Sequence, residues 1–301
     1  MAETTPSAGV TSTRLRAHGV TGTLLQAGDP AATEAVVFLH GSPGNAGDWS
    51  DFLGPTGEFA RAVAFDMPGF GDARTFAGFD HRVEGDYRDF LIHAMDELGL
   101  ARVHLVGHDF GVPWGLAWAA ARPERLASLT LINAGAMQDY RWHMYARVWQ
   151  TPLLGELTQR ISNRRGMRIL LRRANPRLPV DFIDRMYDKY DAHTRATVLS
   201  LYRAARDPEA MLTESLATLP TTIPTLVLWG GDDPWLPARH AELQSMIWPD
   251  SRIEVLPGLG HWCFADDPRA VADLLLPFLR AQVGRSERAG GSGQAPSAPA
   301  R

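Results

Sequence analysis

Short apolar runs alternate with amphipathic stretches along most of this chain. The runs lie at residues 35–40, 62–69, 103–109, 129–135, 225–233 and 252–258. Their near-continuous apolar character is typical of strands that are buried on both faces of a parallel sheet. Helical patterns follow at 82–99, 111–123 and 267–282. This alternation predicts an α/β fold with a mostly parallel, doubly wound sheet and right-handed crossovers.

The pattern changes at both ends and once in the middle of the chain. An antiparallel hairpin is expected before the first buried run, and residues 137–217 show helical patterns without a strand signal. A helical insertion there would cover the carboxyl ends of the strands, where ligands bind in open α/β sheets. We therefore expect an α/β core from 13–136 and 218–283 and a helical cap from 137–217. The small, polar segments 1–12 and 284–301 are predicted to be disordered.

Composition narrows the classes of protein that remain. The chain is 45% hydrophobic and 21% charged, as is common for globular proteins, and its net charge of −4 offers no general attraction to nucleic acid or anionic lipid. Cys263 is the only cysteine, so a disulfide framework is excluded and a cytoplasmic location is expected. We expect no signal peptide, no membrane span and no nucleic-acid partner. The sequence does not indicate an oligomeric state.

Three polar residues follow predicted strands in an order that suggests catalysis. Asp109 stands in GHDFG, where Gly107 and Gly111 permit a sharp strand-to-helix turn. Asp233 follows the next-to-last apolar run, in GGDDP, and His261 follows the last one, in GLGHW. Nucleophile, acid and histidine occur in this order in α/β-hydrolase triads. The carboxyl ends of parallel strands meet at one edge of a sheet, so these side chains are expected to lie close together.

With HGSPG at 40–44, these motifs make the chain resemble the α/β-hydrolase superfamily, and specifically its aspartate-nucleophile branch of epoxide hydrolases and haloalkane dehalogenases. The resemblance covers roughly residues 20–280. It implies that Asp109 is the nucleophile and His261 the general base. Between the neighbouring aspartates, the family spacing from Gly230 selects Asp233 over Asp232 as the acid that orients the histidine.

The resemblance also implies an oxyanion hole formed by the backbone N–H groups of Ser42 and Phe110. An aspartate nucleophile suits attack on a saturated carbon. Asp109 would form an alkyl ester there, whereas a serine would form an ether that no later step cleaves easily. His261, oriented by Asp233, would then activate a water that attacks the ester carbonyl, and the hole would meet the resulting oxyanion. This chemistry needs no cofactor and no metal.

The leaving group separates two candidate reactions. An epoxide oxygen needs a proton donor, which the related epoxide hydrolases supply from cap tyrosines. Tyr202 matches one such position, in a Tyr-Arg pair 31 residues before Asp233. The second tyrosine position reads LLGE at 153–156, so Tyr145 or Tyr140 would have to replace it.

A halide needs only N–H donors, which dehalogenases supply from tryptophan indoles or an asparagine amide. Phe110 stands where these enzymes commonly carry a tryptophan, and Ser42 where they frequently carry an asparagine. Epoxide hydrolases usually carry an aromatic residue at the position of Ser42. Trp49, Trp142 or Trp149 could still supply an indole to a halide.

The sequence therefore favours an enzyme that acts on a small apolar organic substrate. Epoxide hydrolysis to a vicinal diol is the leading hypothesis, and haloalkane dehalogenation is the alternative. A catalytically inactive α/β-hydrolase-fold protein that binds a ligand is a third hypothesis, disfavoured because all three triad residues are present. His40, Trp49 and Tyr145 are further candidates for contacts with the substrate.

Overall fold

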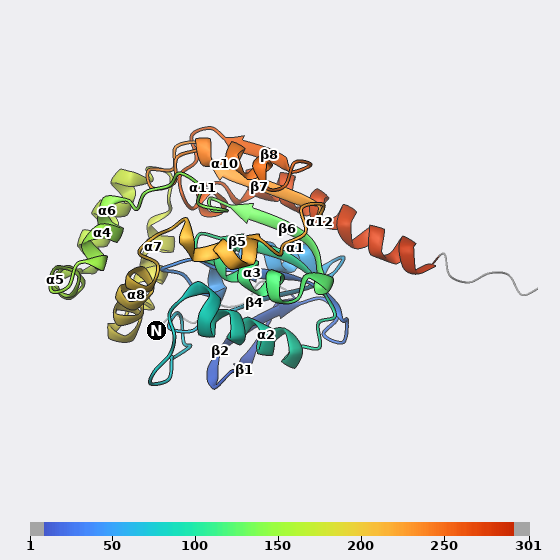
Figure 1. The fold of residues 1–301 in the computed structure, drawn as a ribbon, viewed down its shortest axis with the longest axis horizontal. Coiled ribbons are helices and arrows are strands. Elements are labelled where there is room, and N and C mark those ends of the chain that lie inside the picture. Colours follow the sequence, from blue (N-terminus) through green and yellow to red (C-terminus); the bar gives the residue numbers. More distant parts are fainter. Residues whose placement is uncertain (1–8, 292–301) are drawn as a thin grey trace, which may run out of the picture.

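The computed structural model describes residues 9–291, which contain an eight-stranded sheet (Figure 1). Its strand order is β1-β2-β4-β3-β5-β6-β7-β8. β1 and β2 form the expected antiparallel hairpin and β2 pairs antiparallel with β4, while all later pairs are parallel. The prediction of a mostly parallel sheet is confirmed. The strands are Thr11–Ala17, Val20–Ala27, Glu34–Leu39, Arg61–Phe65, Arg102–His108, Leu126–Ile132, Thr225–Gly230 and Arg252–Leu256.

Helices cover both faces of the sheet, which explains why its central strands are apolar at nearly every position. In β3, Val36 and Phe38 pack into the core on one face, and Val37 and Leu39 pack into the core on the other. All four side chains are fully buried. The covering helices are α1 (Ser50–Gly57) and α12 (Pro268–Gly291) on one face, and α2 (Arg88–Glu97) and α3 (Gly111–Ala121) on the other.

The connection from β6 to β7 contains helices and no strand, as the sequence predicts for the cap segment. Figure 1 shows α4–α8 together at one side of the molecule, beyond the tip of the β6 arrow. The cap helices are α4 Met144–Gln150, α5 Leu154–Ile161, α6 Arg164–Ala174, α7 Val180–Asp188, α8 Ala192–Ala204 and α9 Thr213–Leu216. The remaining helices are α10 Arg239–Leu243, α11 Cys263–Asp266 and the short turns Ala46–Trp49, Val83–Tyr87, Pro123–Arg125, Ala210–Leu212 and Gln244–Met246.

Parts of both segments that the sequence predicts to be disordered have regular secondary structure. β1 begins at Thr11, where its pairing with β2 orders the chain, and α12 continues through 284–291. The composition of that segment misled the prediction, because its arginine, glutamate and alanine residues are compatible with continuing a helix that packing has already formed. Residues 1–8 and 292–301 lie outside the described residues. Over residues 9–291, no helix has the length and apolar character needed to cross a bilayer.

Candidate active site

Asp109 lies in a tight turn between β5 and α3. Its φ is +49°, a left-handed conformation that aspartate tolerates better than most side chains. The two flanking glycines allow the turn because a Cβ on Gly107 would lie 2.9 Å from the Val112 nitrogen, and one on Gly111 would lie 2.3 Å from the Leu39 oxygen. The turn therefore presents the Asp109 carboxylate at the carboxyl end of the sheet.

One oxygen of this carboxylate is held by the loop after β3. The Ser42 backbone N–H donates to Asp109 Oδ1 at 2.7 Å. A Cβ on Gly41 would lie 2.4 Å from the Asp109 Cβ, so the close approach of this loop requires glycine. The backbone N–H of Phe110, the next residue along the turn, has no acceptor among the described residues. Both predicted oxyanion-hole donors are thus beside Asp109, and one of them already bonds to it.

His261 lies between Asp109 and Asp233, the two aspartates that the sequence singles out. Its Nδ1 is 2.7 Å from Asp233 Oδ2, and its Nε2 is 3.5 Å from Asp109 Oδ2. Asp233 Oδ1 accepts the backbone N–H groups of Trp235 and Leu236. Because an ionised carboxylate only accepts hydrogen bonds, His261 Nδ1 donates to Asp233 and Nε2 is directed toward Asp109.

Of the two neighbouring aspartates, the structure places Asp233 against His261. Asp233 is buried, whereas the side chain of Asp232 is exposed. Asp233 follows β7, and its backbone N–H bonds to the Gly230 carbonyl in the turn that ends that strand. This turn directs the second aspartate inward and the first outward.

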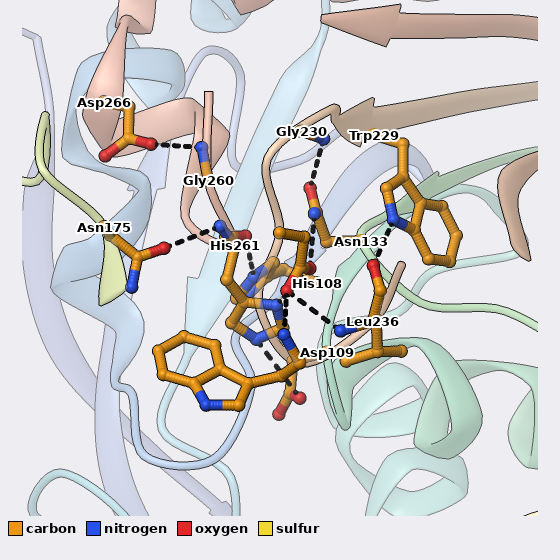
Figure 2. A network of polar contacts seen from close by, with 12 residues as sticks. His108, Asp109, Asn133, Asn175, Trp229, Gly230, Leu236, Gly260, His261 and Asp266 are labelled. Carbon is orange, nitrogen blue, oxygen red and sulfur yellow. Dashed lines mark hydrogen bonds and ion pairs between the residues drawn. The ribbon is translucent and has the colours of Figure 1, made fainter. Parts of the chain in front are cut away.

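Two asparagines complete the network, and the sequence analysis did not identify either (Figure 2). Asn133 donates through Nδ2 to Asp233 at 2.7 Å and accepts the Gly230 N–H, which ties the ends of β6 and β7 together. Asn175, from the cap, accepts the backbone N–H of His261 at 2.9 Å. The position of Asn133 at the end of a buried strand was a usable signal. No local pattern could have identified Asn175, because its partner His261 is 86 residues away in the sequence.

The charges of the network shift the pKa values of its members in a consistent way. Burial alone would lower the pKa of His261, but the carboxylates of Asp233 and Asp109 outweigh it and raise that pKa to about 10. Burial opposes ionisation of both aspartates, yet His261 holds their pKa values below the usual range. At neutral pH the resting site therefore holds an imidazolium between two carboxylates.

A cavity of about 320 Å³ lies between the sheet and the cap, and Asp109 and His261 line it. Most of its other lining residues are apolar, which suits a small apolar ligand. Tyr202 of α8 lines the same cavity, and its hydroxyl has no hydrogen-bond partner among the described residues. The Tyr202 ring packs edge-on against Phe110, 5.3 Å between centroids, so the phenol is held above the turn that carries Asp109.

A model of the alpha/beta hydrolase family matches residues 36–274. The chain belongs to the alpha/beta hydrolase family. This hydrolase is 28% identical over 263 residues to a 2-hydroxy-6-oxononadienedioate/2-hydroxy-6-oxononatrienedioate hydrolase from Comamonas testosteroni, over 83% of this chain and 89% of the relative. It is 25% identical over 266 residues to epoxide hydrolase 3 of Xenopus tropicalis, over 81% and 71% of the two chains.

Solved structures share the fold of this hydrolase. Epoxide hydrolase A from Mycobacterium thermoresistibile matches with a TM-score of 0.77 at 21% identity, over 90% of this chain and 98% of that one. A haloalkane dehalogenase from Agrobacterium tumefaciens matches with a TM-score of 0.75 at 19% identity, over 92% and 97%. The predicted resemblance to alpha/beta hydrolases, with epoxide hydrolases and a haloalkane dehalogenase among the relatives, is confirmed.

Two of the three residues predicted to contact the substrate of the hydrolase do not line the cavity. His40 uses both ring nitrogens inside the loop: Nδ1 donates to the Gly41 carbonyl and Nε2 accepts the Met67 N–H. Trp49 is fully buried in the core on the face of the sheet covered by α1 and α12, where it stacks on Phe264 with 4.8 Å between ring centroids. The predictions for His40 and Trp49 are therefore wrong. The third candidate, Tyr145, does line the cavity.

The structure shows which of the other aromatic side chains line the cavity with an O–H or N–H group that is not already hydrogen-bonded. Tyr140 donates its hydroxyl to the Trp235 carbonyl at 3.1 Å, and it does not line the cavity. Trp142 lines the cavity, but its indole N–H donates to the Ala205 carbonyl at 2.6 Å. Trp149 lines the cavity and its indole has no hydrogen-bond partner among the described residues. His143, which the sequence analysis did not consider, also lines it.

The ion pairs at this site predict a pH dependence of the stability of the hydrolase. The pKa of His261 is raised from 6.5 to about 10 on folding, so its contribution is complete below about pH 6.5 and is lost as the pH rises through about 10. We expect the free energy of unfolding of the wild type to fall, relative to that of His261→Gln, across this window. Urea unfolding of both proteins at a series of pH values measures the difference. Parallel curves would contradict the ion-pair assignment.

Proposed function

We propose that this alpha/beta-fold hydrolase opens epoxides to vicinal diols through an alkyl ester on Asp109. One observation carries the proposal. The Asp109–His261–Asp233 arrangement and the unpartnered hydroxyl of Tyr202 face one apolar cavity. A carboxylate nucleophile together with a protonated phenol matches the two needs of an epoxide, which are attack on a saturated carbon and a proton donor for the oxygen.

The bonds of Asp109 divide its two oxygens between two tasks. Oδ1 is held by the Ser42 N–H, so Oδ2 is the atom that attacks the carbon of the epoxide. Oδ1 then remains as the ester carbonyl oxygen. When water adds to that carbonyl, the negative charge develops on Oδ1, beside the N–H groups of Ser42 and Phe110. Removing one donor of this kind typically costs about 3 kcal/mol of barrier.

Ester formation itself prepares His261 to act as a base. In the resting site, Asp109 and Asp233 both hold the pKa of His261 high and keep the ring protonated. Esterification removes the charge of Asp109, which removes one of these two contributions and lowers the pKa of the imidazole, so the ring releases its proton to solvent. A neutral Nε2 then accepts a proton from the attacking water, while Asp233 stabilises the imidazolium that forms.

The relative from Comamonas testosteroni is named as a hydrolase of 6-oxo dienedioates and trienedioates, but the nucleophile disfavours attack on such an oxo group here. Attack by Asp109 on a ketone carbonyl would lead to an anhydride, which is a higher-energy acyl species than the ester formed from a hydroxyl nucleophile. Attack on a saturated carbon gives a stable alkyl ester. We therefore assign the electrophile as saturated.

Between an epoxide and a halide, the donors facing the cavity favour the epoxide. Burial, with a smaller contribution from the charge of Asp109, raises the pKa of Tyr202 well above its usual value, so the phenol stays protonated as a donor. Phe110 offers no side-chain donor, the Trp142 indole is already bonded, and Trp49 lies outside the cavity. The free indole of Trp149 is the observation that keeps dehalogenation as the second candidate.

A panel of terminal epoxides and 1-haloalkanes tests the proposal directly. Diol formation without halide release supports epoxide hydrolysis, and halide release alone supports the dehalogenase alternative. Tight ligand binding with neither product would favour the non-catalytic alternative. The expected result is diol formation, and the absence of diol from every epoxide would overturn the proposal.

Tyr202→Phe is expected to slow formation of the ester from an epoxide by about 10²- to 10⁴-fold, because it removes the proton donor to the epoxide oxygen. The rate of ester hydrolysis should change little, since His261 and Asp233 carry that step. Stopped-flow and quench measurements of the two steps separate these effects. Equal slowing of both steps would show that the substitution disturbs the site as a whole. Unchanged ester formation would remove Tyr202 from the mechanism.

A further inference from the structure

His143 begins the first cap helix and faces the same cavity as Asp109. It is the N-cap residue of α4, and it lines the cavity together with Tyr202 and Trp235. It belongs neither to the triad nor to the predicted set of donors. Its position raises the question of what an imidazole contributes to a largely apolar chamber.

The hydrogen bond of the cap fixes which ring nitrogen of His143 carries the proton. The backbone N–H of Ala146 donates to Nδ1 at 3.2 Å, so Nδ1 is unprotonated. A neutral imidazole then carries its hydrogen on Nε2. Burial lowers the pKa of this ring to about 4, and it stays neutral at physiological pH. Nε2 has no acceptor among the described residues, which leaves one N–H donor free.

The packing of the rings places the His143 imidazole in one aromatic cluster with Tyr202 and Trp235. The His143 ring lies 6.2 Å from that of Tyr202 and 6.4 Å from that of Trp235, centroid to centroid. Trp235 in turn packs edge-on against His261 at 5.2 Å. Tyr145 contacts the rings of His143 and Trp149, not those of Tyr202 or Trp235. His143 is therefore better placed than Tyr145 to act beside Tyr202.

We propose that the Nε2–H of His143 is the second donor to the epoxide oxygen, paired with the hydroxyl of Tyr202. It takes the role for which the sequence suggested Tyr145 or Tyr140. This role rests on the proposed epoxide hydrolysis. A neutral imidazole is a very weak acid, so His143 stabilises the developing alkoxide by hydrogen bonding and keeps its proton. Tyr202 is the residue that transfers one.

The protons balance over the cycle. Asp109 Oδ2 forms a bond to a ring carbon, the carbon–oxygen bond of the epoxide breaks, and its electron pair stays on the oxygen, which takes the proton of Tyr202. Loss of the Asp109 charge lets the His261 imidazolium release its proton to solvent. Water then adds to the ester carbonyl and gives one proton to the neutral ring. Collapse of the adduct expels the second alkoxide, which takes that proton from His261. The water's other proton, left on Asp109, returns to the Tyr202 phenolate through the cavity. His261, once more between two carboxylates, takes back from solvent the proton that it released when the ester formed, and the site is restored.

Two substitutions separate this role from the capping role of His143. In His143→Asn, the amide oxygen can replace Nδ1 as acceptor for the Ala146 N–H, but no donor remains at the place of Nε2. In His143→Gln, the amide nitrogen can reach the place of Nε2 and the helix cap is lost. The donor role predicts damage in the first variant, and a purely structural role predicts damage in the second.

The probes are styrene oxide for ester formation and phenylacetamide for binding, since the amide oxygen can accept the same two hydrogen bonds. We expect His143→Asn to slow ester formation about 10- to 100-fold and to weaken phenylacetamide binding about tenfold, with His143→Gln within about threefold of wild type in both measurements. Wild-type behaviour of His143→Asn, or equal losses in both variants, would overturn the role of His143.

The experiment distinguishes failure of the proposed epoxide hydrolysis from failure of the role of His143. A wild-type enzyme that opens neither styrene oxide nor the other epoxides of the panel refutes the proposed function, and with it any role of His143 in opening an epoxide. An active wild type with an unimpaired His143→Asn variant refutes the role of His143 alone. Thermal unfolding of both variants shows whether loss of the cap affects stability.

Discussion

Asp109→Ala is expected to abolish turnover, lowering kcat/KM for an epoxide substrate by about 10⁴-fold or more, because no other group can form the ester. Asp233 cannot replace it, since that carboxylate is buried and already accepts hydrogen bonds from His261, Asn133, Trp235 and Leu236. Steady-state kinetics and intact-protein mass spectrometry measure the loss of product and of the covalent adduct.

Asp232→Ala is the matched control. It removes a carboxylate from the neighbouring position, but that side chain is exposed and makes no contact with His261. Wild-type activity is expected. If Asp109→Ala keeps more than a tenth of the wild-type rate, or if Asp232→Ala is the variant that loses activity, the assignment of the nucleophile is wrong.

Oxygen isotopes test the same intermediate without a substitution. Water attacks the carbonyl carbon of Asp109, so the oxygen that enters the diol comes from the carboxylate. In a single turnover in ¹⁸O-water, with enzyme in excess, the label is expected in Asp109 and not in the diol. Later turnovers then carry label into product. Label in the diol after the first turnover would show direct attack by water.

His261→Gln is expected to trap the ester. Attack by Asp109 on the epoxide still proceeds, but the water has no base, and general base catalysis of this kind contributes about 10²- to 10⁴-fold. The variant should give one equivalent of adduct per protein and then nearly stop. Glutamine preserves a hydrogen bond to Asp233, so the variant is expected to fold.

Mass spectrometry of His261→Gln after mixing with an epoxide should show the protein mass increased by that of the substrate, with the added mass on the peptide that contains Asp109. His93→Gln is a suitable control because His93 lies on the exposed face of α2. Continued fast turnover by His261→Gln, or an adduct on a different residue, would contradict the mechanism.

The linear sequence carried much of the fold and the main residues of the site. The buried strands could be predicted from their apolar runs, since a strand covered by α1 and α12 on one face and by α2 and α3 on the other has no polar side. Asp109 was identifiable because the flanking glycines that its turn needs are adjacent in sequence. His261 was identifiable because it follows a strand, and the ends of parallel strands converge.

Contacts between distant segments were decided only by the tertiary structure. Helical periodicity in the cap could not show whether Tyr145 or His143 lies nearer to the triad, because that depends on how α4 docks against α8 and the sheet. His40 and Trp49 were predicted to contact the substrate, but the ring of His40 is hydrogen-bonded within its own loop and Trp49 is buried in the core. The sequence located Asp109 through the local geometry of its turn, and packing across the chain decided which groups share its cavity.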